Sequence, residues 1–332
     1  MLRHWLGLGL LGVGMVAACN DQGISRPPTI VDPGDGGASS SGGDTGVPGP
    51  EPRPNGIVRV ATFNVHLFFD TKCDTGKCTA SDFEKQNTAA TFASEVDRIA
   101  KAIEKLDADV IALEEVENET CLNAVVDRLA ADGFVYPIKK LGESGPAASV
   151  DVGIIARGDL VTIKTHKDTP IPRLAPETGT TYFTRELLEM HLKFGSNEMV
   201  MFAAHFRSQR DDDPGRRLAE ATAARDIISA AAKAKPNAFV VLGGDLNDVP
   251  GSDTLKALEA NGDMVRLLSD YATDKQGTFT FQGKAEAIDH LYAAKSQASR
   301  YVAGTSIVVR DAAVGGLGAS DHAAVRADIK MN

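Results

Sequence analysis

The sequence is poor in cysteine and carries no excess of positive charge. Four cysteines are few for 332 residues, and no histidine or further cysteine lies near Cys73 and Cys78 at the spacing of a zinc site. This argues against a cysteine-based metal centre. The net charge of −10 argues against a protein that wraps nucleic acid with a broadly basic surface, although a locally basic cleft is compatible with it.

Several common catalytic motifs are also missing from the sequence. It has no G-x-S-x-G elbow, so a Ser-His-Asp hydrolase is not expected. A phosphate-binding loop that ends in Gly-Lys-Ser/Thr and a dinucleotide-binding fingerprint are absent as well. After the first 19 residues, no apolar run suggests a transmembrane helix.

Residues 1–19 have the pattern of an export signal. Arg3 precedes a short apolar run that ends in Ala17-Ala18-Cys19. Two interpretations are open: an ordinary signal peptide cleaved near Ala18, or a segment that resembles a bacterial lipoprotein signal, in which Cys19 becomes the lipid anchor.

The segment 20–56 favours the lipoprotein interpretation. It is rich in Gly, Pro and Ser and nearly free of apolar residues, which is typical of a disordered tether. We therefore expect an extracytoplasmic protein, either held through Cys19 at a bacterial membrane of the cell envelope or surface, or secreted. The sequence does not tell which membrane carries the anchor.

Residues 57–332 are expected to form one domain of about 275 residues. Apolar, β-rich runs such as 57–65 and 183–193 alternate with amphipathic segments, among them an alanine-rich helix over 215–234 that follows Pro214. The pattern predicts the α/β class, with sheets packed together and helices outside them. A local disulfide between Cys73 and Cys78 is one option, but the pairing of these residues with Cys121 is left open.

Five predicted strands share an unusual feature, because each carries polar side chains at one end. These residues are Asn64, Glu114 and Glu115, His205 and Arg207, Asp245 and Asn247, and Asp321 and His322. A polar group beside a core costs about 1–3 kcal/mol unless it is paired. One such residue is usually structural, whereas five such ends predict that the strands converge on one cleft.

The chemistry of these residues favours a hard divalent cation. The carboxylates of Glu115, Asp245 and Asp321, together with amides, suit Mg²⁺, with Mn²⁺ or Ca²⁺ as alternatives. The two histidines and Arg207 are expected to add positive charge and donors for phosphate oxygens. His66 and His166 have no partner that the sequence identifies.

Six segments in chain order resemble the motifs of the endonuclease/exonuclease/phosphatase family. They run from about residue 59 to residue 329 and read "ATFNV", "IALEEVEN", "AAHFRSQ", "GGDLND", "IDHLY" and "SDHAAV". The resemblance implies a four-layer α/β sandwich of two mainly antiparallel β-sheets flanked by helices. The segment "LEEVEN" looks most like the secreted bacterial nucleases of this family.

The resemblance also implies a role for each motif residue. Glu115 would be the main Mg²⁺ ligand, with Asn64 and Asp321 at the same site. Asp245 would position or deprotonate the attacking water, and Asn247 would steady Asp245 and the phosphate.

The histidines would act on the substrate side. His322, oriented by Asp289, would contact the scissile phosphate, and His205 would bind phosphate or assist the leaving oxygen. Arg185, on a predicted strand, and Arg207 would be substrate contacts.

The sequence departs from the family pattern at two places. Glu114 stands where the family often has glutamine, so it would pair with basic groups or add to the metal site. The tyrosine of some members has no clear equivalent, and Tyr136 and Tyr182 are the candidates. Arg210, Arg216 and Arg217 lie in a charged segment that is read mainly as a solvated face.

The predicted function is a Mg²⁺-dependent phosphodiester hydrolase, most simply an extracytoplasmic endonuclease in which an activated water attacks in line. The alternatives are a sphingomyelin or phosphoinositide phosphohydrolase and a catalytically silent surface binding module. No protein partner is predicted. The sequence does not tell whether the substrate is DNA or RNA or whether cleavage is endo- or exonucleolytic. It leaves the oligomeric state open as well.

Overall fold

The computed structural model describes residues 49–331 except 52, 147–148, 211 and 313–314. Residues Gly46–Asn332 form one compact unit. The predicted signal segment, Cys19 and most of the predicted tether lie outside the described residues. In the part of the chain that is described, no helix is both long and apolar enough to cross a membrane.

The first sheet has six strands in the order β15-β16-β1-β2-β4-β3. The central strands β1 and β2 are parallel, and the other four neighbouring pairs are antiparallel. The strands are β1 (Ile57–Phe68), β2 (Val110–Val116), β3 (Ile138–Gly142), β4 (Asp151–Ala156), β15 (Ile307–Val309) and β16 (Ala324–Lys330).

The second sheet repeats this plan in the order β11-β14-β10-β9-β8-β5. Here β9 and β10 are the parallel pair, and the other four pairs are antiparallel. The strands are β5 (Asp159–Lys164), β8 (Leu188–Phe194), β9 (Asn197–His205), β10 (Phe239–Asp245), β11 (Met264–Arg266) and β14 (Asp289–Ala294).

Helices cover the outer face of each sheet. Two short hairpins and four 3₁₀ segments connect the larger elements in the described part of the chain. The helices are α1 (Ala89–Leu106), α2 (Glu119–Ala131), α3 (Pro214–Ala234) and α4 (Asp253–Glu259). The hairpins are β6 (Ile171–Pro172) with β7 (Thr180–Thr181) and β12 (Phe279–Phe281) with β13 (Lys284–Glu286); the 3₁₀ segments are Ala260–Gly262, Leu267–Asp270, Thr273–Lys275 and Lys295–Arg300.

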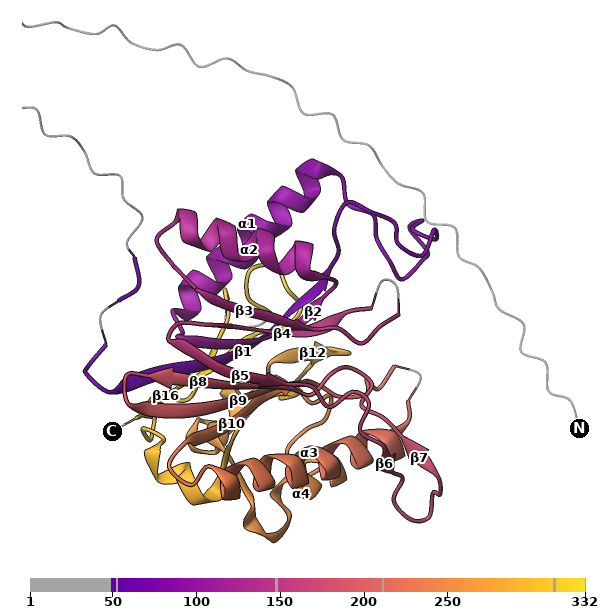
Figure 1. The fold of residues 1–332 in the computed structure, drawn as a ribbon. Coiled ribbons are helices and arrows are strands. Elements are labelled where there is room, and N and C mark those ends of the chain that lie inside the picture. The colour runs from indigo at the N-terminus through magenta and orange to yellow at the C-terminus, as the bar shows by residue number, and fades with distance from the viewer. Residues whose placement is uncertain (1–48, 52, 147–148, 211, 313–314, 332) are drawn as a thin grey trace, which may run out of the picture. The chain divides into compact units, whose positions relative to one another are not determined.

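The result is the predicted four-layer sandwich. Figure 1 shows α1 and α2 on one side, the two sheets face to face, and α3 and α4 on the other side. Alternation along the strands builds three cores. Val60 and Val110 point between the sheets, Phe63 and Leu113 point to α1 and α2, and residues such as Phe202 point to α3 and α4. The fold class is therefore confirmed.

Local sequence signals explain where the helices begin. The side chain of Thr88 accepts a hydrogen bond from the Thr91 amide at the start of α1, and Asn118 caps α2 through the Cys121 amide. Asp213 caps α3, with Pro214 in the first turn, as the sequence predicts. The predicted strand over 183–193 is shorter than expected, because β8 begins only at Leu188.

Candidate active site

The strand register brings the polar strand ends together. Asn64 on β1 lies beside Glu114 on β2, where the regular pairing of these parallel strands is interrupted, and Asp245 lies beside His205 at the ends of β10 and β9. The strand β14 runs antiparallel to β10, so Asp289 at its start pairs with Asp245. The central strands of both sheets thus carry polar residues at the same end of the sandwich.

The alternation of side chains along each strand decides which of these side chains point between the sheets. Val60 faces the inter-sheet core, and Asn64 follows it at an even spacing along β1. Met201 and Val241 likewise precede His205 and Asp245 by four residues. The rule that buries the core residues therefore also buries the polar ends between the sheets.

Asn64 joins the two sheets through its amide group. Its Nδ2 donates to Glu115 Oε1 at 3.2 Å and to Asp245 Oδ2 at 3.1 Å, and its Oδ1 accepts from the His66 amide at 3.0 Å. Asn64 is fully buried. One amide thus sets the relative position of two carboxylates that belong to different sheets. Asn64, Glu115, Asp245, Asp289, His205, His322, Asp321 and His66 are called the strand-end cluster below.

Glu115 reaches this position because the backbone leaves the strand alternation. Its φ is 65°, which is uncommon for a residue other than glycine and costs on the order of 1–3 kcal/mol. The carboxylate also accepts a hydrogen bond from the Leu67 amide at 2.8 Å. His66 and Leu67 have positive φ values too, of 62° and 45°. Backbone strain is concentrated where the two parallel strands end.

Asp245 is held in place by the turn that follows it. The Asn247 amide donates to Asp245 Oδ1 at 2.9 Å, and Asn247 has a φ of 52°. The side-chain amide of Asn247 donates to the carbonyl of Phe206 at 3.1 Å, while Leu246 is fully buried, as predicted. Asn247 therefore steadies Asp245 with its backbone, and its side chain is used to fix the turn.

The two glycines before Asp245 allow close approach of neighbouring strands. A Cβ atom at Gly244 would lie 2.0 Å from the carbonyl oxygen of Ala204 on β9. A Cβ atom at Gly243 would lie 3.2 Å from the Cβ of Thr62 on the opposite sheet. Only glycine fits both sites without a shift of the backbone or of the facing sheet.

His322 forms a buried ion pair with Asp289. The Nδ1 atom of His322 lies 2.9 Å from Asp289 Oδ2, and its Nε2 lies 3.9 Å from both Asp245 Oδ2 and Asp321 Oδ1. Although burial opposes the charge, the Asp289 carboxylate raises the pKa of His322 to about 10. The ring of Phe279 packs at 4.9 Å from the His322 ring. His322 is thus an imidazolium at neutral pH.

His205 behaves differently although it lies beside the same aspartate. Its Nε2 is 3.6 Å from Asp245 Oδ2, too long for a hydrogen bond. Burial, and then the charges of Arg185 and His322, lower the pKa of His205 well below its ordinary value. The expectation that both histidines add positive charge therefore holds for His322 and not for His205, which is neutral.

The buried carboxylates have raised pKa values. Burial and the charge of Asp289 raise the pKa of Asp245 to about 7. The same two causes raise the pKa of Glu114 well above its ordinary value, although Thr62 Oγ1 donates to Glu114 Oε1 at 2.8 Å. Glu114 is fully buried and makes no ion pair with a described residue. The expectation that it pairs with basic groups is wrong, and as a neutral acid it resembles the glutamine of the family pattern.

Asp321 pairs with a histidine that the sequence left unassigned. The Nδ1 atom of His66 lies 2.9 Å from Asp321 Oδ1, and both side chains are partly exposed. The hydrogen bond to Asp321 raises the pKa of His66, and the charge of Glu115 adds to it. Its position two residues after Asn64 on β1 was the only signal for His66, because no sequence pattern indicates its pairing with Asp321.

Of the two predicted arginine contacts, Arg185 lies near the strand-end cluster. Arg185 donates to the Phe206 carbonyl at 3.3 Å, and the charges of Glu115 and Asp245 act on it. It lies in the bend before β8, so its predicted place on a strand is wrong. The backbone amide of Arg207 donates to Glu220 Oε2 at 2.7 Å.

Other polar residues weighed from the sequence lie elsewhere or have structural partners. Arg217 is buried and pairs with Asp248 and Asp212. The hydroxyl of Tyr136 donates to the Ala108 carbonyl, at the start of β2, the end opposite to Glu115.

The remaining polar residues that were weighed from the sequence are Tyr182, Arg210, Arg216 and His166. Tyr182 is half exposed, and its carbonyl accepts from Arg216 at 2.9 Å. Arg210 is exposed. His166 pairs with Glu189.

The donor set of the strand-end cluster fits Mg²⁺. Glu115, Asn64 and Asp321 offer carboxylate and amide oxygens, which this ion prefers, and no thiolate is near. Within the cluster, the carboxylate and imidazole atoms that lie close enough together to hold an ion belong to Asp245, Asp289 and His322. We interpret that trio as an ion pair, since His322 is already bonded to Asp289 through Nδ1.

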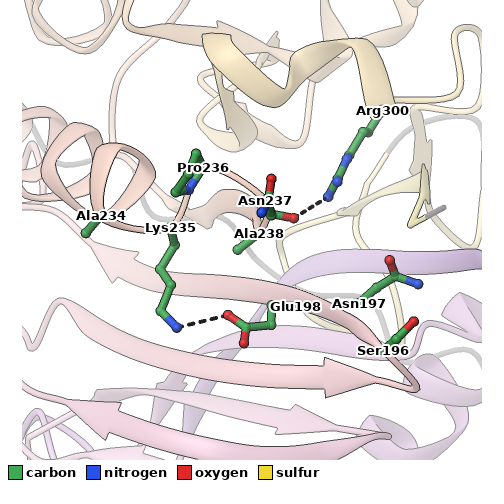
Figure 2. A pocket seen from close by; sticks show the side chains of 9 residues that line it. All are labelled: Ser196, Asn197, Glu198, Ala234, Lys235, Pro236, Asn237, Ala238 and Arg300. Carbon is green, nitrogen blue, oxygen red and sulfur yellow. Dashed lines mark hydrogen bonds and ion pairs between the residues drawn. The ribbon is translucent and has the colours of Figure 1, made fainter.

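A hollow lined by described residues lies at the other end of the strands. It measures about 500 Å³ and is lined by residues such as Asn197 at the start of β9 and Ala238 just before β10. Its charged groups have partners: Lys235 pairs with Glu198, and Arg300 donates to the Asn237 carbonyl (Figure 2). We therefore place the candidate site at the strand-end cluster.

Comparisons with known proteins point in the same direction as the geometry. A sequence model of the endonuclease/exonuclease/phosphatase family matches residues 59–315. No curated protein sequence matches the chain.

Solved structures share the fold at low sequence identity. A Bacteroides vulgatus endonuclease/exonuclease/phosphatase is 17% identical with a TM-score of 0.58, and the match covers 83% of this chain and 99% of that one. TDP2 from C. elegans is 16% identical with a TM-score of 0.58, covering 82% and 74%. D. rerio TDP2, solved with a single-strand DNA product, is 13% identical with a TM-score of 0.57, covering 82% and 98%.

Proposed function

Because the chain belongs to the endonuclease/exonuclease/phosphatase family and is a hydrolase of phosphate ester bonds, we propose that it is a Mg²⁺-dependent nuclease. The observation that carries this proposal is the contact of Asn64 with both Glu115 and Asp245. It brings an acid suited to a metal ion and an acid suited to a proton transfer together between the two sheets.

The metal side of the proposal rests on oxygen ligands. Glu115 would be the main ligand, with Asn64 and Asp321 beside it. Bound there, Mg²⁺ would neutralise charge on a phosphate oxygen. The strained backbone at Glu115 and its hydrogen bond from the Leu67 amide hold the carboxylate ready for this role.

The proton-transfer side rests on Asp245. A carboxylate with a pKa near 7 suits the task of accepting a proton from water at neutral pH. The Asn247 amide fixes Oδ1, and Oδ2 receives the Asn64 amide, so the carboxylate cannot rotate freely. In this role Asp245 would orient and deprotonate the attacking water.

Positive charge for the phosphate comes from His322. Its imidazolium is kept protonated by Asp289 and would stabilise negative charge on the phosphate. His205, which is neutral, would supply a hydrogen bond to a phosphate oxygen or to the leaving oxygen. Arg185 would assist from the edge of the cluster, and Arg207 would contact the substrate further along.

Nucleic acid is the proposed substrate, and the cell envelope is the proposed location. The DNA product in the D. rerio TDP2 structure is consistent with a nucleic acid substrate for this fold. Cys73 and Cys78 form a disulfide, which is typical of proteins in oxidising, extracytoplasmic compartments. Together with the lipoprotein-like segment that ends at Cys19, this supports an enzyme that is lipid-anchored or secreted.

A substrate panel tests the proposal. The purified protein would be incubated with plasmid DNA, RNA, sphingomyelin, a phosphoinositide and a generic phosphodiester, each with Mg²⁺ and with EDTA. We expect cleavage of nucleic acid that requires Mg²⁺. Turnover of lipid alone would show that the protein is a phospholipid phosphohydrolase and not a nuclease. No turnover of any substrate would favour a catalytically silent binding module.

A further inference from the structure

The segment between β1 and α1 gathers acidic residues around a point outside the strand-end cluster. Residues 69–88 contain no helix or strand. The disulfide Cys73–Cys78 closes a small loop within this segment, and the Asn87 amide donates to the Asp70 carbonyl at 3.0 Å at its base. The segment is therefore folded back on itself rather than extended.

Three carboxylates meet where this segment touches the end of β2. Asp74 and Glu84 come from the segment, and Glu117 directly follows β2. One oxygen from each of the three lies within 4.8 Å of the others. Oxygen atoms gathered at this spacing could hold one metal ion between them.

One of these carboxylates has an oxygen that nothing in the described chain satisfies. Glu117 is only 4% exposed. Its Oε2 accepts from the Asp70 amide at 2.8 Å and from Asn118 Nδ2 at 3.2 Å, whereas Oε1 is buried without a hydrogen-bond partner. A buried, unpaired carboxylate oxygen is costly, so it indicates that a ligand belongs beside it.

No basic side chain compensates the negative charge of this group. Asp74, Glu84 and Glu117, with the neighbouring Asp70, make no ion pair with a lysine or arginine among the described residues. Glu84 instead accepts from the Asp74 and Thr75 amides and from the Thr75 hydroxyl. Backbone amides orient the carboxylates but cannot neutralise them.

The chemistry of the group selects a hard cation. Cys73 and Cys78 lie near Glu84, but their sulfur atoms are bonded to each other and are not thiolate ligands. Oxygen ligands alone remain, one of them on an exposed residue that leaves room for water. Ligands from an irregular segment suit Ca²⁺, which tolerates flexible geometry, better than Mg²⁺, which demands a near-ideal octahedron.

We propose that Asp74, Glu84 and Glu117 bind a Ca²⁺ ion that ties the segment 70–87 to the end of β2. The site is distinct from the strand-end cluster, in which Glu115 faces Asn64. It is joined to the end of β1 through the backbone, because the Glu117 amide donates to the Phe68 carbonyl at 3.1 Å. The bound ion would hold the loop that follows β1 without taking part in hydrolysis.

Thermal unfolding of the purified protein tests this site. Tm would be measured with EDTA, with Mg²⁺ alone, and with Mg²⁺ plus about 10 mM Ca²⁺, a saturating level for an extracellular Ca²⁺ module. We expect Ca²⁺ to raise Tm by about 5 °C beyond the effect of Mg²⁺. The Asp74→Asn variant, altered at an exposed position, and the isosteric Glu117→Gln variant should lose this increment.

Two further variants separate this site from others. Asp82→Asn changes an acid of the same segment whose carboxylate accepts from the amide and hydroxyl of Thr79 and lies outside the proposed site, so it should keep the increment. Glu115→Gln, in the proposed Mg²⁺ site, should keep it as well, so the result does not depend on the proposed function. Three results would each overturn the proposal. The first is a Tm increment that is retained in Asp74→Asn and Glu117→Gln. The others are a Tm increase with Mg²⁺ that equals the one with Ca²⁺, and no effect of Ca²⁺ on the Tm of the wild type.

Discussion

The Nδ1 atom of His322 lies 2.9 Å from Asp289 Oδ2, and both side chains are buried between the sheets. The pair joins the start of β14 to the turn before β16, so it links the two sheets just as the Asn64 contacts do. The charge of Asp289 raises the pKa of His322 to about 10, which keeps the imidazole protonated over the neutral range.

This pair predicts the alkaline limit of activity. The protonated form of His322 is the active one, so kcat/KM should fall as pH rises through about 10. Asp289→Asn removes the charge that raises the pKa of His322, so the fall should move toward the ordinary value of about 6.5. The measurement is the pH profile of kcat/KM for both proteins, and an unchanged alkaline limit in the variant would contradict the account.

His66 predicts a pH dependence of metal binding. Its hydrogen bond to Asp321 raises the pKa of His66, and the protonated ring competes with a cation for that carboxylate. The Mg²⁺ concentration for half-maximal activity should therefore rise as pH falls through the pKa of His66. In His66→Asn this dependence should be weaker, and metal titrations at several pH values would check it. Equal dependence in both proteins would rule the competition out.

Glu114 and Glu115 should differ strongly in their sensitivity to substitution by glutamine. Glu114 is a buried neutral acid bonded to Thr62, so Glu114→Gln should change kcat/KM by no more than about threefold. Glu115→Gln weakens the proposed Mg²⁺ site and should lower kcat/KM by at least about 100-fold. Steady-state kinetics at saturating Mg²⁺ would separate the two, and similar losses would show that Glu114 acts as a carboxylate.

Gly244 should tolerate no side chain. A Cβ atom there would meet the Ala204 carbonyl oxygen at 2.0 Å, so Gly244→Ala should lower the free energy of unfolding by about 3 kcal/mol. Gly153 on β4 is the matched control, because its Cβ would have ordinary contacts no closer than 3.6 Å. Denaturant unfolding would compare the two variants, and equal stability would refute the steric argument.

Much of the fold was accessible from the sequence because the patterns are strong. The spacing of Val96, Ile99, Ile103 and Leu106 predicts the buried face of α1, and all four are buried. The order of six motifs predicts the sandwich, and the polar residues at five strand ends predict that those ends converge. The alternation fails at Glu115, where a positive φ redirects the side chain, and no sequence pattern encodes that angle.

Features that depend on tertiary contacts could not be predicted. The neutral state of His205 results from burial and from the charges of Arg185 and His322, which come from other parts of the chain. The pairing of His66 with Asp321 joins residues far apart in the sequence. The contact of Asp74, Glu84 and Glu117 likewise depends on how an irregular segment folds back onto β2.

The most direct test of the central claim is the effect of Asp245→Asn on Mg²⁺-dependent nucleic acid cleavage. The substitution keeps the shape of the side chain but removes the proposed proton acceptor. Asp127→Asn is the matched control, since Asp127 is 79% exposed on α2. The account predicts that Asp245→Asn lowers kcat by about 1,000-fold with the fold intact, and that Asp127→Asn leaves it unchanged. A loss of less than about tenfold in Asp245→Asn would contradict the role of the strand-end cluster in hydrolysis.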